Sequence, residues 1–482
     1  MQRTIVVRTI WVVYCFLESL FLRLYRWIGY LLGDTKDAHR QSSIAVLDGV
    51  RAIACLIVVA YHISLISRDT NVWVPNDPSH LILSSIALAG GSGVTLFFVL
   101  SGFLLFMPYA KSLLFDSTWP AARLFYMRRV LRIIPAYYAS LFLMILLFHQ
   151  EYLQRAHWHD LFLFLTFFMD SSSATFEKLN GPFWTLAVEW QFYLLLPLMM
   201  LVVGLIVRHG TLKWRMWKLT LCLLGIICWG LCSRYLGMYY TANTTQTFIV
   251  PRPVMNDALF FLYGQSGKYL EDFAVGMLIC MCYIYSQRVG PDHPFSVGMR
   301  RVSFWLWRAG IVLLFFMAMW HLDWFYVNHW TFLDAISRTY GWFNYFNWLG
   351  EICLALGFGL CVIAILYGSA HLQHPFTWRP LRWIGLISFS MYMWHLPLLI
   401  IAMNLVTYHF AAWGGYRIYG FYWLWVLLVV IPVSFLMYIW VEKPWMKFGD
   451  KFRSQPAKPE PIKSAPAPED VSTPAEPVFA GR

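Results

Sequence analysis

Two ionisable side chains in one apolar stretch have a spacing that could support chemistry. In LDGVRAIACLIVVAYHIS, His62 follows Arg51 by eleven residues. On a helix this is about three turns, or roughly 16 Å, so both lie on nearly the same face. Ionisable groups in an apolar helix mark a functional site by default, and a histidine can act as a general base. The structural alternatives are a snorkelling anchor for Arg51 and a packing histidine for His62.

A lone carboxylate, Glu189, lies in the apolar stretch WTLAVEWQFYLLLP and needs a partner there. Its expected depth is comparable to that of His62, from the same side. A Glu189–His62 pair would orient the imidazole and raise its basicity, as general-base chemistry requires. The alternative is a structural ion pair with an outer arginine.

Two arginines, Arg129 and Arg132, are three residues apart in RRVLRIIPAYY and share a helix face. The planar guanidinium binds phosphate with two parallel hydrogen bonds. This spacing indicates an anion clamp, and ordinary topology charges are the alternative.

Weaker candidates lie in two further apolar stretches. Ser101 interrupts LFFVLSGFLL, where small-residue packing is at least as good an explanation as substrate contact. Tyr392 and His395 lie in SFSMYMWHLPLL, and His395 could be catalytic, bind substrate or form a helix–helix hydrogen bond. The cysteines lack the spacing of a metal site, so no metal is expected.

The elements that must position these residues are apolar helices. The chain is 59% hydrophobic and only 13% charged, whereas soluble domains are about a quarter charged. Runs long enough to cross a bilayer lie near 44–66, 83–107, 130–148, 184–207, 216–236, 269–286, 304–320, 349–368, 383–405 and 420–441. The sequence therefore predicts an all-α, polytopic transmembrane helical bundle of about ten spans. Asp160–Met169 is too short and is expected to be re-entrant or interfacial.

Lys and Arg alternate between rich and poor loops, and the rich ones lie near 111–132, 208–218, 288–308 and 379–382. The positive-inside rule makes these loops cytoplasmic and places both termini in the cytoplasm. The net charge of +12 therefore needs no nucleic acid to explain it, and the lipid bilayer is the expected partner.

Three regions are expected along the chain. Residues 1–42 form a cytoplasmic or interfacial amphipathic segment, in which 9–33 is an interfacial helix or an eleventh span. Residues 43–445 form the transmembrane domain. Residues 454–482 form a Pro/Ala-rich cytoplasmic tail that cannot bury a core and is expected to be disordered.

The stretches quoted above occur in the order typical of one family. The chain resembles the acyltransferase family 3 integral membrane proteins, which O-acylate carbohydrates and related molecules of the cell envelope. The resemblance puts His62 in the proposed catalytic place, matches Arg129 and Arg132 to the Arg-x-x-Arg motif, and matches Glu189 to the acidic position after Trp-Thr-Leu. One departure is Thr95, where members usually carry an Asp.

The resemblance implies a multi-pass protein, expected in a bacterial inner membrane, with no bound cofactor and with cytoplasmic acyl-CoA as co-substrate. Arg51, Arg129 and Arg132 would bind the acyl-CoA phosphates. His62 with Glu189 would activate a hydroxyl of a carbohydrate or lipid-linked glycan. The acyl group is expected to be acetyl, and a covalent acyl-histidine remains open.

Two other classes of function fit intramembrane His, Glu and Arg on physical grounds: a transporter or exporter of a glycan or small molecule, and a scaffold of an envelope-polymer assembly. Oxyanion stabilisation by Tyr392 or His395 is open. The aromatic outer loops 237–268 and 321–348 are candidate sugar-facing surfaces.

Overall fold

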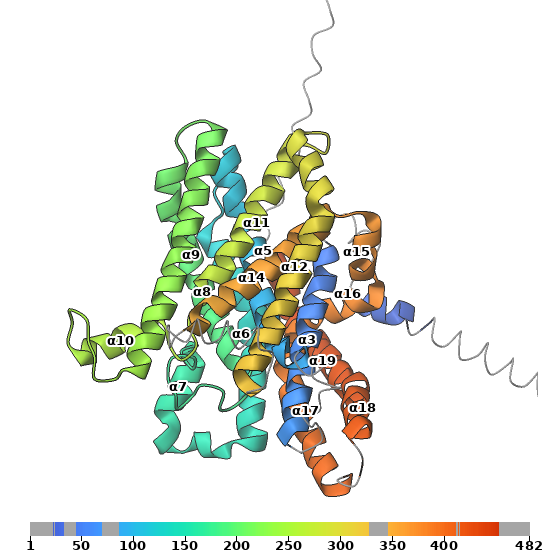
Figure 1. The fold of residues 1–482 in the computed structure, drawn as a ribbon. Coiled ribbons are helices and arrows are strands. Elements are labelled where there is room, and N and C mark those ends of the chain that lie inside the picture. The colour runs from blue at the N-terminus through green and yellow to red at the C-terminus, as the bar shows by residue number, and fades with distance from the viewer. Residues whose placement is uncertain are drawn as a thin grey trace, which may run out of the picture.

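The computed structural model describes residues 23, 25–32, 45–69, 86–326, 346–410, 413 and 415–452; the side chains of 68–69, 321–326, 346–347 and 416 are not described. The described residues form helices and no strand (Figure 1), which confirms the all-α prediction. The tail 454–482, most of the segment 1–42 and most of the loop 321–348 lie outside the described residues, although residues 25–32 are helical.

Long helices make up the bundle, and shorter ones connect them. The long helices are α3 Val46–Asp69, α5 Gly93–Phe115, α6 Ala122–Phe148, α8 Phe183–Val207, α9 Leu212–Ala242, α11 Leu270–Val289, α12 Pro294–Tyr326, α14 Gly350–Tyr367 and α17 Ser388–His409. The last crossing is built from α18 Gly415–Trp425, α19 Ile431–Met437 and α20 Lys443–Asp450, joined by π-helical turns at Val426–Val430 and Tyr438–Glu442.

Nine stretches of the described chain are long and apolar enough to span a membrane, and each coincides with an expected span. The expected span 269–286 is not among these nine stretches, because the first turn of α11 carries Glu271 and Asp272. It nevertheless lies parallel to α5: Phe98 packs on Phe273, and Phe103 packs on Tyr283. Through these contacts α11 belongs to the same described bundle as the nine apolar stretches.

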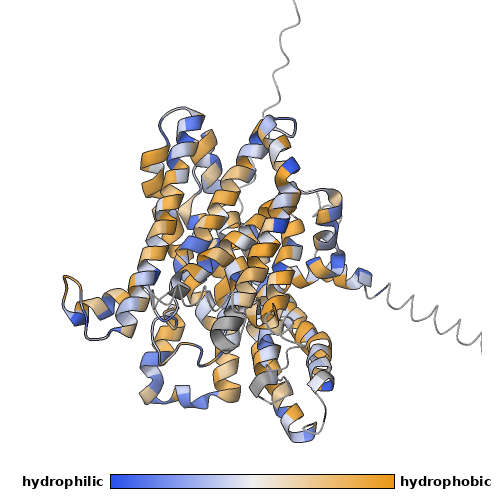
Figure 2. Cartoon of the chain, in the orientation of Figure 1, coloured by the Kyte–Doolittle hydropathy of each residue, from blue (hydrophilic) through white to orange (hydrophobic). Residues whose placement is uncertain are grey.

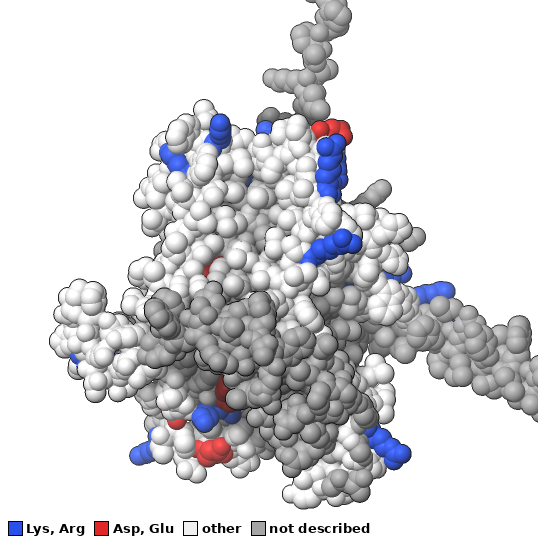
Figure 3. Space-filling view, viewed as in Figure 1, with Lys and Arg blue, Asp and Glu red and all other residues white. Residues whose placement is uncertain are grey.

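The polytopic bundle has the surface expected of a protein in lipid. Figure 2 shows apolar residues along the middle of the helices and polar residues towards their ends. On the face in Figure 3, Lys and Arg side chains lie near the upper and lower ends and along the right-hand edge, and the middle of the face carries few of them. Large apolar side chains such as Leu205, which is 79% exposed, would face lipid.

Glycines let α5 and α11 approach backbone to backbone. A Cβ at Gly102 would lie 2.0 Å from the Phe273 carbonyl oxygen, and one at Gly276 would lie 2.0 Å from the Val99 oxygen. Side chains larger than hydrogen are therefore excluded at both positions. This contact fixes the rotation of α5 and, with it, the direction of Ser101.

The short helix α7 Trp158–Thr166 has nine residues and cannot span a bilayer, as the sequence predicts. A left-handed Phe167 ends it, and a loop then leads to α8. The amphipathic α10 Arg252–Leu262 lies in the loop 237–268 and, like α7, in the lower half of Figure 1.

Candidate active site

Five helices bring the three predicted arginines to one narrow cavity of about 100 Å³. Its polar lining combines most of the candidate residues from five separate stretches of sequence: Arg51 from α3, Ser101 from α5, Arg129 and Arg132 from α6, Thr185, Glu189 and Tyr193 from α8, and Ser388 and Tyr392 from α17. We call this space the arginine cavity. His62 and His395 do not line it.

Glu189 lies in the arginine cavity with partners that the sequence did not suggest. Ser101 Oγ donates a hydrogen bond to Glu189 Oε1 at 2.6 Å, and the Tyr193 hydroxyl donates to the same oxygen. Arg129 lies over the Tyr193 ring, 5.7 Å from its centre. The expected Glu189–His62 pair is therefore wrong, because the face of α8 that carries Glu189 is turned towards α5 and α6.

The charged groups around the arginine cavity would attract an anion. Asp48 and Glu442 do not line the cavity but interact electrostatically with Arg51 and Arg132, and Asp48 also pairs with Arg382 at 3.4 Å. Four guanidinium groups thus accompany three carboxylates in this described cluster, and its net charge is positive. Arg129 Nε is buried and has no hydrogen-bond partner among the described residues, so it is available to an anionic ligand.

His62 faces a second and larger cavity of about 770 Å³. Its lining joins the second half of α3 to α17 and to the loop before α8, and includes Tyr61, His62, His149, Glu177, Lys178, Asn180, Trp184, Thr185, Tyr392 and Asn404. We call this space the histidine cavity. It offers aromatic faces, amides and charged groups, a combination that can orient a polar ligand.

The partner of His62 is a second histidine. Nδ1 of His62 lies 3.2 Å from Nε2 of His395 and 3.0 Å from the Val58 carbonyl oxygen. Nδ1 of His395 lies 3.2 Å from the Met391 carbonyl oxygen. His395 is 0% exposed, and of the alternatives considered for it, this contact corresponds to a hydrogen bond between helices, with the candidate base as its partner.

A hydrogen bond between Thr185 and Tyr392 lies where the two cavities meet. The two hydroxyl oxygens are 2.8 Å apart, and both residues, together with Val94, line the arginine cavity and the histidine cavity alike. Phe97 packs edge-on against the Tyr392 ring. Tyr392 therefore lies at the boundary between the cavities.

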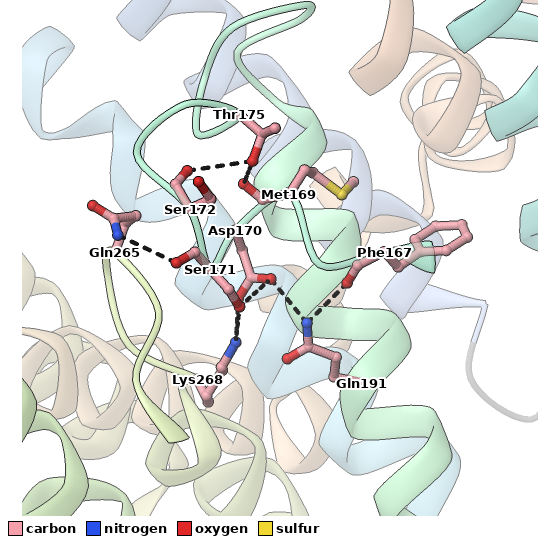
Figure 4. A network of polar contacts seen from close by, with 9 residues as sticks. All are labelled: Phe167, Met169, Asp170, Ser171, Ser172, Thr175, Gln191, Gln265 and Lys268. Atoms are coloured by element: carbon pink, nitrogen blue, oxygen red, sulfur yellow. Dashed lines mark hydrogen bonds and ion pairs between the residues drawn. The ribbon is translucent and has the colours of Figure 1, made fainter. Parts of the chain in front are cut away.

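The loop that closes the histidine cavity is fixed by a buried polar network (Figure 4). Asp170, 1% exposed, pairs with Lys268 and accepts a hydrogen bond from Gln191 Nε2 at 2.8 Å. The backbone N–H of Gln265 donates a hydrogen bond to the backbone carbonyl oxygen of Asp170. Burial lowers the pKa of Lys268, and the Asp170 carboxylate opposes that shift. Further along the loop, Asn180 donates to the Met393 carbonyl at 2.8 Å and ties it to α17.

The same loop also supplies the carboxylate of Glu177, which lines the histidine cavity. Burial raises the pKa of Glu177, and neighbouring Lys178 opposes the rise. Neither this carboxylate nor the Asp170 network was predicted from the sequence. A signal for the network was present, because Lys268 is one of the few basic residues in the loops that are otherwise poor in Lys and Arg.

The departure at Thr95 has a structural counterpart. Thr95 Oγ1 donates to Glu351 Oε2 of α14 at 3.0 Å. A carboxylate is therefore present beside position 95 but comes from a helix 256 residues away. A separate ion pair joins Arg234 of α9 to Glu271 of α11 at 2.6 Å. In the described part of the chain, no group of three His, Cys, Asp or Glu side chains is arranged to hold a metal ion.

Comparison with known proteins identifies similar chains. The family model described as "Acyltransferase domain" matches residues 44–441. The "Putative peptidoglycan O-acetyltransferase YrhL" of Bacillus subtilis (strain 168) is 24% identical over 442 residues, which cover 87% of this chain and 57% of that protein. The "Peptidoglycan O-acetyltransferase OatA" of Listeria monocytogenes is 25% identical over 383 residues, 75% of this chain and 50% of that protein.

The chain thus spans between half and three fifths of the length of these curated relatives. No solved structure matches it. The match to the family model covers all five stretches on which the resemblance was based, and confirms that resemblance.

Proposed function

The chain belongs to the acyltransferase family whose model it matches, and we propose that it is a membrane O-acyltransferase that moves an acetyl group from acyl-CoA to a hydroxyl of a cell-envelope carbohydrate. The observation that carries the proposal is the meeting of two unlike cavities at Thr185 and Tyr392. One cavity is basic and the other contains the His62 imidazole. A thioester donor and a hydroxyl acceptor need these two environments on either side of one base.

The arginine cavity is the proposed site of the donor. Its volume of about 100 Å³ is too small for a whole coenzyme and suits the thin pantetheine arm. The phosphates would bind at the mouth, next to Arg129 and Arg132 in the first half of α6. The net positive charge and the unpartnered Arg129 Nε support this assignment.

The histidine cavity is the proposed site of the acceptor. Tyr61 and Trp184 offer aromatic faces to sugar rings, and Asn180, Asn404 and Glu177 could hydrogen-bond hydroxyl groups. The names of the relatives make peptidoglycan one candidate among such carbohydrates. The distribution of Lys and Arg in the loops supports cytoplasmic termini and entry of acyl-CoA from the cytoplasm, in a bacterial inner membrane.

In the proposed reaction His62 removes the proton from the acceptor hydroxyl. The hydroxyl oxygen forms a bond to the thioester carbonyl carbon, the carbon–sulfur bond breaks, and the departing thiolate takes the proton back from His62. An acyl-histidine route differs only in that the imidazole first forms the bond to the carbonyl carbon. Both routes need the thioester to pass Thr185 and Tyr392.

Mass spectrometry of envelope glycans from cells with and without the gene tests the function and identifies the substrates. We expect a mass increment of one acetyl group per modified sugar, which disappears with the gene. Identical glycans in both strains, together with release of no free CoA from acetyl-CoA by the purified protein, would instead support a transporter or a scaffold.

A further inference from the structure

The contacts of the two histidines fix where their protons are. The Met391 carbonyl oxygen can only accept a hydrogen bond, so Nδ1 of His395, 3.2 Å away, carries a hydrogen. In a neutral imidazole the other nitrogen is then an acceptor. Nε2 of His395 therefore presents a lone pair to His62 Nδ1 at 3.2 Å.

The contacts of His62 fix its tautomer in the same way. Its Nδ1 lies 3.0 Å from the Val58 carbonyl oxygen and 3.2 Å from Nε2 of His395, and both are acceptors. Nδ1 of His62 must therefore carry the hydrogen. Nε2 of His62 is left unprotonated, which is the state that a general base requires.

We infer that His395 is a positioning residue that fixes the tautomer of His62 and accepts a hydrogen bond from its imidazolium during acyl transfer. This inference rests on the proposed function. It gives to a neutral imidazole the part that a carboxylate plays in a Ser-His-Asp triad. Glu189 cannot play that part, because Ser101 and Tyr193 hold it in the arginine cavity.

A neutral acceptor suits this location better than a carboxylate. His395 is completely buried, and a lone buried carboxylate beside His62 would hold the imidazole in its charged form. The neutral pair has no net charge to bury at rest. When His62 takes the acceptor's proton, the lone pair of His395 Nε2 faces the new positive charge.

The expected pH behaviour depends on the other groups around His62. The ionisable residues that line the same cavity are Tyr61, His149, Glu177, Lys178 and Tyr392. Tyr61 packs edge-on against the His62 ring, 5.0 Å between ring centres, whereas His395 places a ring nitrogen 3.2 Å from Nδ1 of His62. Replacement of His395 should therefore change the titration of His62 more than replacement of His149 does.

Three variants separate the acceptor from the bulk of the side chain. H395L removes the acceptor, H395Q places an amide oxygen near the position of Nε2, and H395N reaches only the position of Nδ1. We expect H395L and H395N to lower kcat by about tenfold to a thousandfold, with acetyl-CoA binding changed by less than about twofold. The kcat of H395Q should be at least about tenfold higher than that of H395L. H409Q, at the exposed end of the same helix, is the matched control.

The pH profile of kcat/KM for acetyl transfer in proteoliposomes provides the readout that a purely structural role would not change. Without its acceptor, protonated His62 is less stable, so the acidic limb should move to lower pH in H395L and H395N and stay near wild type in H395Q. Equal kcat in H395L and wild type, or equal losses in H395Q and H395N with an unmoved limb, would overturn the inference. No transfer by the wild-type protein would instead reject the proposed function.

Discussion

The hydroxyl of Ser101 lies 2.6 Å from a carboxylate oxygen of Glu189, and this contact keeps Glu189 on the arginine side of the bundle. The carboxylate is therefore part of the proposed donor site. The base, His62, has His395 as its partner instead. The two ionisable centres are separated by the Thr185–Tyr392 hydrogen bond, so their replacement should have different kinetic consequences.

Replacement of Glu189 by Gln should lower kcat/KM by about tenfold, because Ser101 and Tyr193 lose a charged hydrogen-bond acceptor. The acidic limb of the pH profile should stay in place, since Glu189 does not contact His62. S101A should show the same pattern with a smaller loss. A limb that moves in E189Q as far as in H395L would show that Glu189 acts on His62 after all.

Replacement of Arg132 by Ala should weaken the binding of acetyl-CoA more than the binding of the acceptor. A hydrogen bond to a charged group contributes about 1.5–3 kcal/mol, which corresponds to a rise in KM of roughly tenfold to a hundredfold. R129K keeps the charge but loses the fork that includes Nε, and should show an intermediate loss. The control is R301A, an exposed cation on α12. A larger effect on the acceptor KM than on the acetyl-CoA KM would reject the phosphate clamp.

Replacement of Val94 by Trp should obstruct the boundary that both cavities share. Acetyl-CoA would still bind at the mouth, but the thioester could not reach His62. We expect kcat to fall at least about a hundredfold while acetyl-CoA protects the protein against thermal unfolding as in wild type. V312W on the exposed face of α12 controls for the added bulk. Normal turnover by V94W would exclude this route for the thioester.

Replacement of Lys268 by Met should destabilise the protein, because Asp170 would be left buried without its cation. Loss of one partner of a buried pair costs about 3–5 kcal/mol. The double variant D170N/K268M should recover part of this cost, since no lone charge remains. Unfolding midpoints of the two single variants and the double variant check this, and a double variant no more stable than K268M would contradict it.

Much of the fold follows from the sequence because the length of an apolar run fixes a span without reference to its neighbours. Nine expected spans appear at the expected places. The span 269–286 shows the limit of this reasoning: Glu271 and Asp272 lower its hydropathy, and its place in the bundle depends on contacts with α5.

The sequence predicts how far along its helix each site residue lies, but not towards which neighbouring helix its side chain points. Residue number along a helix gives height, at about 1.5 Å per residue, so Arg51 and His62 could be placed in order along α3. The rotation of one helix against another depends on contacts between distant segments. This is why the sequence paired Glu189 with His62, and why it could not show that Glu351 lies beside Thr95.

We propose that the His62 imidazole performs acyl transfer between a donor and an acceptor that meet inside the membrane. The most direct test is transfer of a labelled acetyl group from acetyl-CoA to envelope glycan by purified protein in proteoliposomes, wild type against His62→Ala. We predict transfer by the wild type and a loss of at least about a hundredfold in the variant, with acetyl-CoA binding and thermal unfolding unchanged. Transfer by folded H62A at the wild-type rate would contradict the claim.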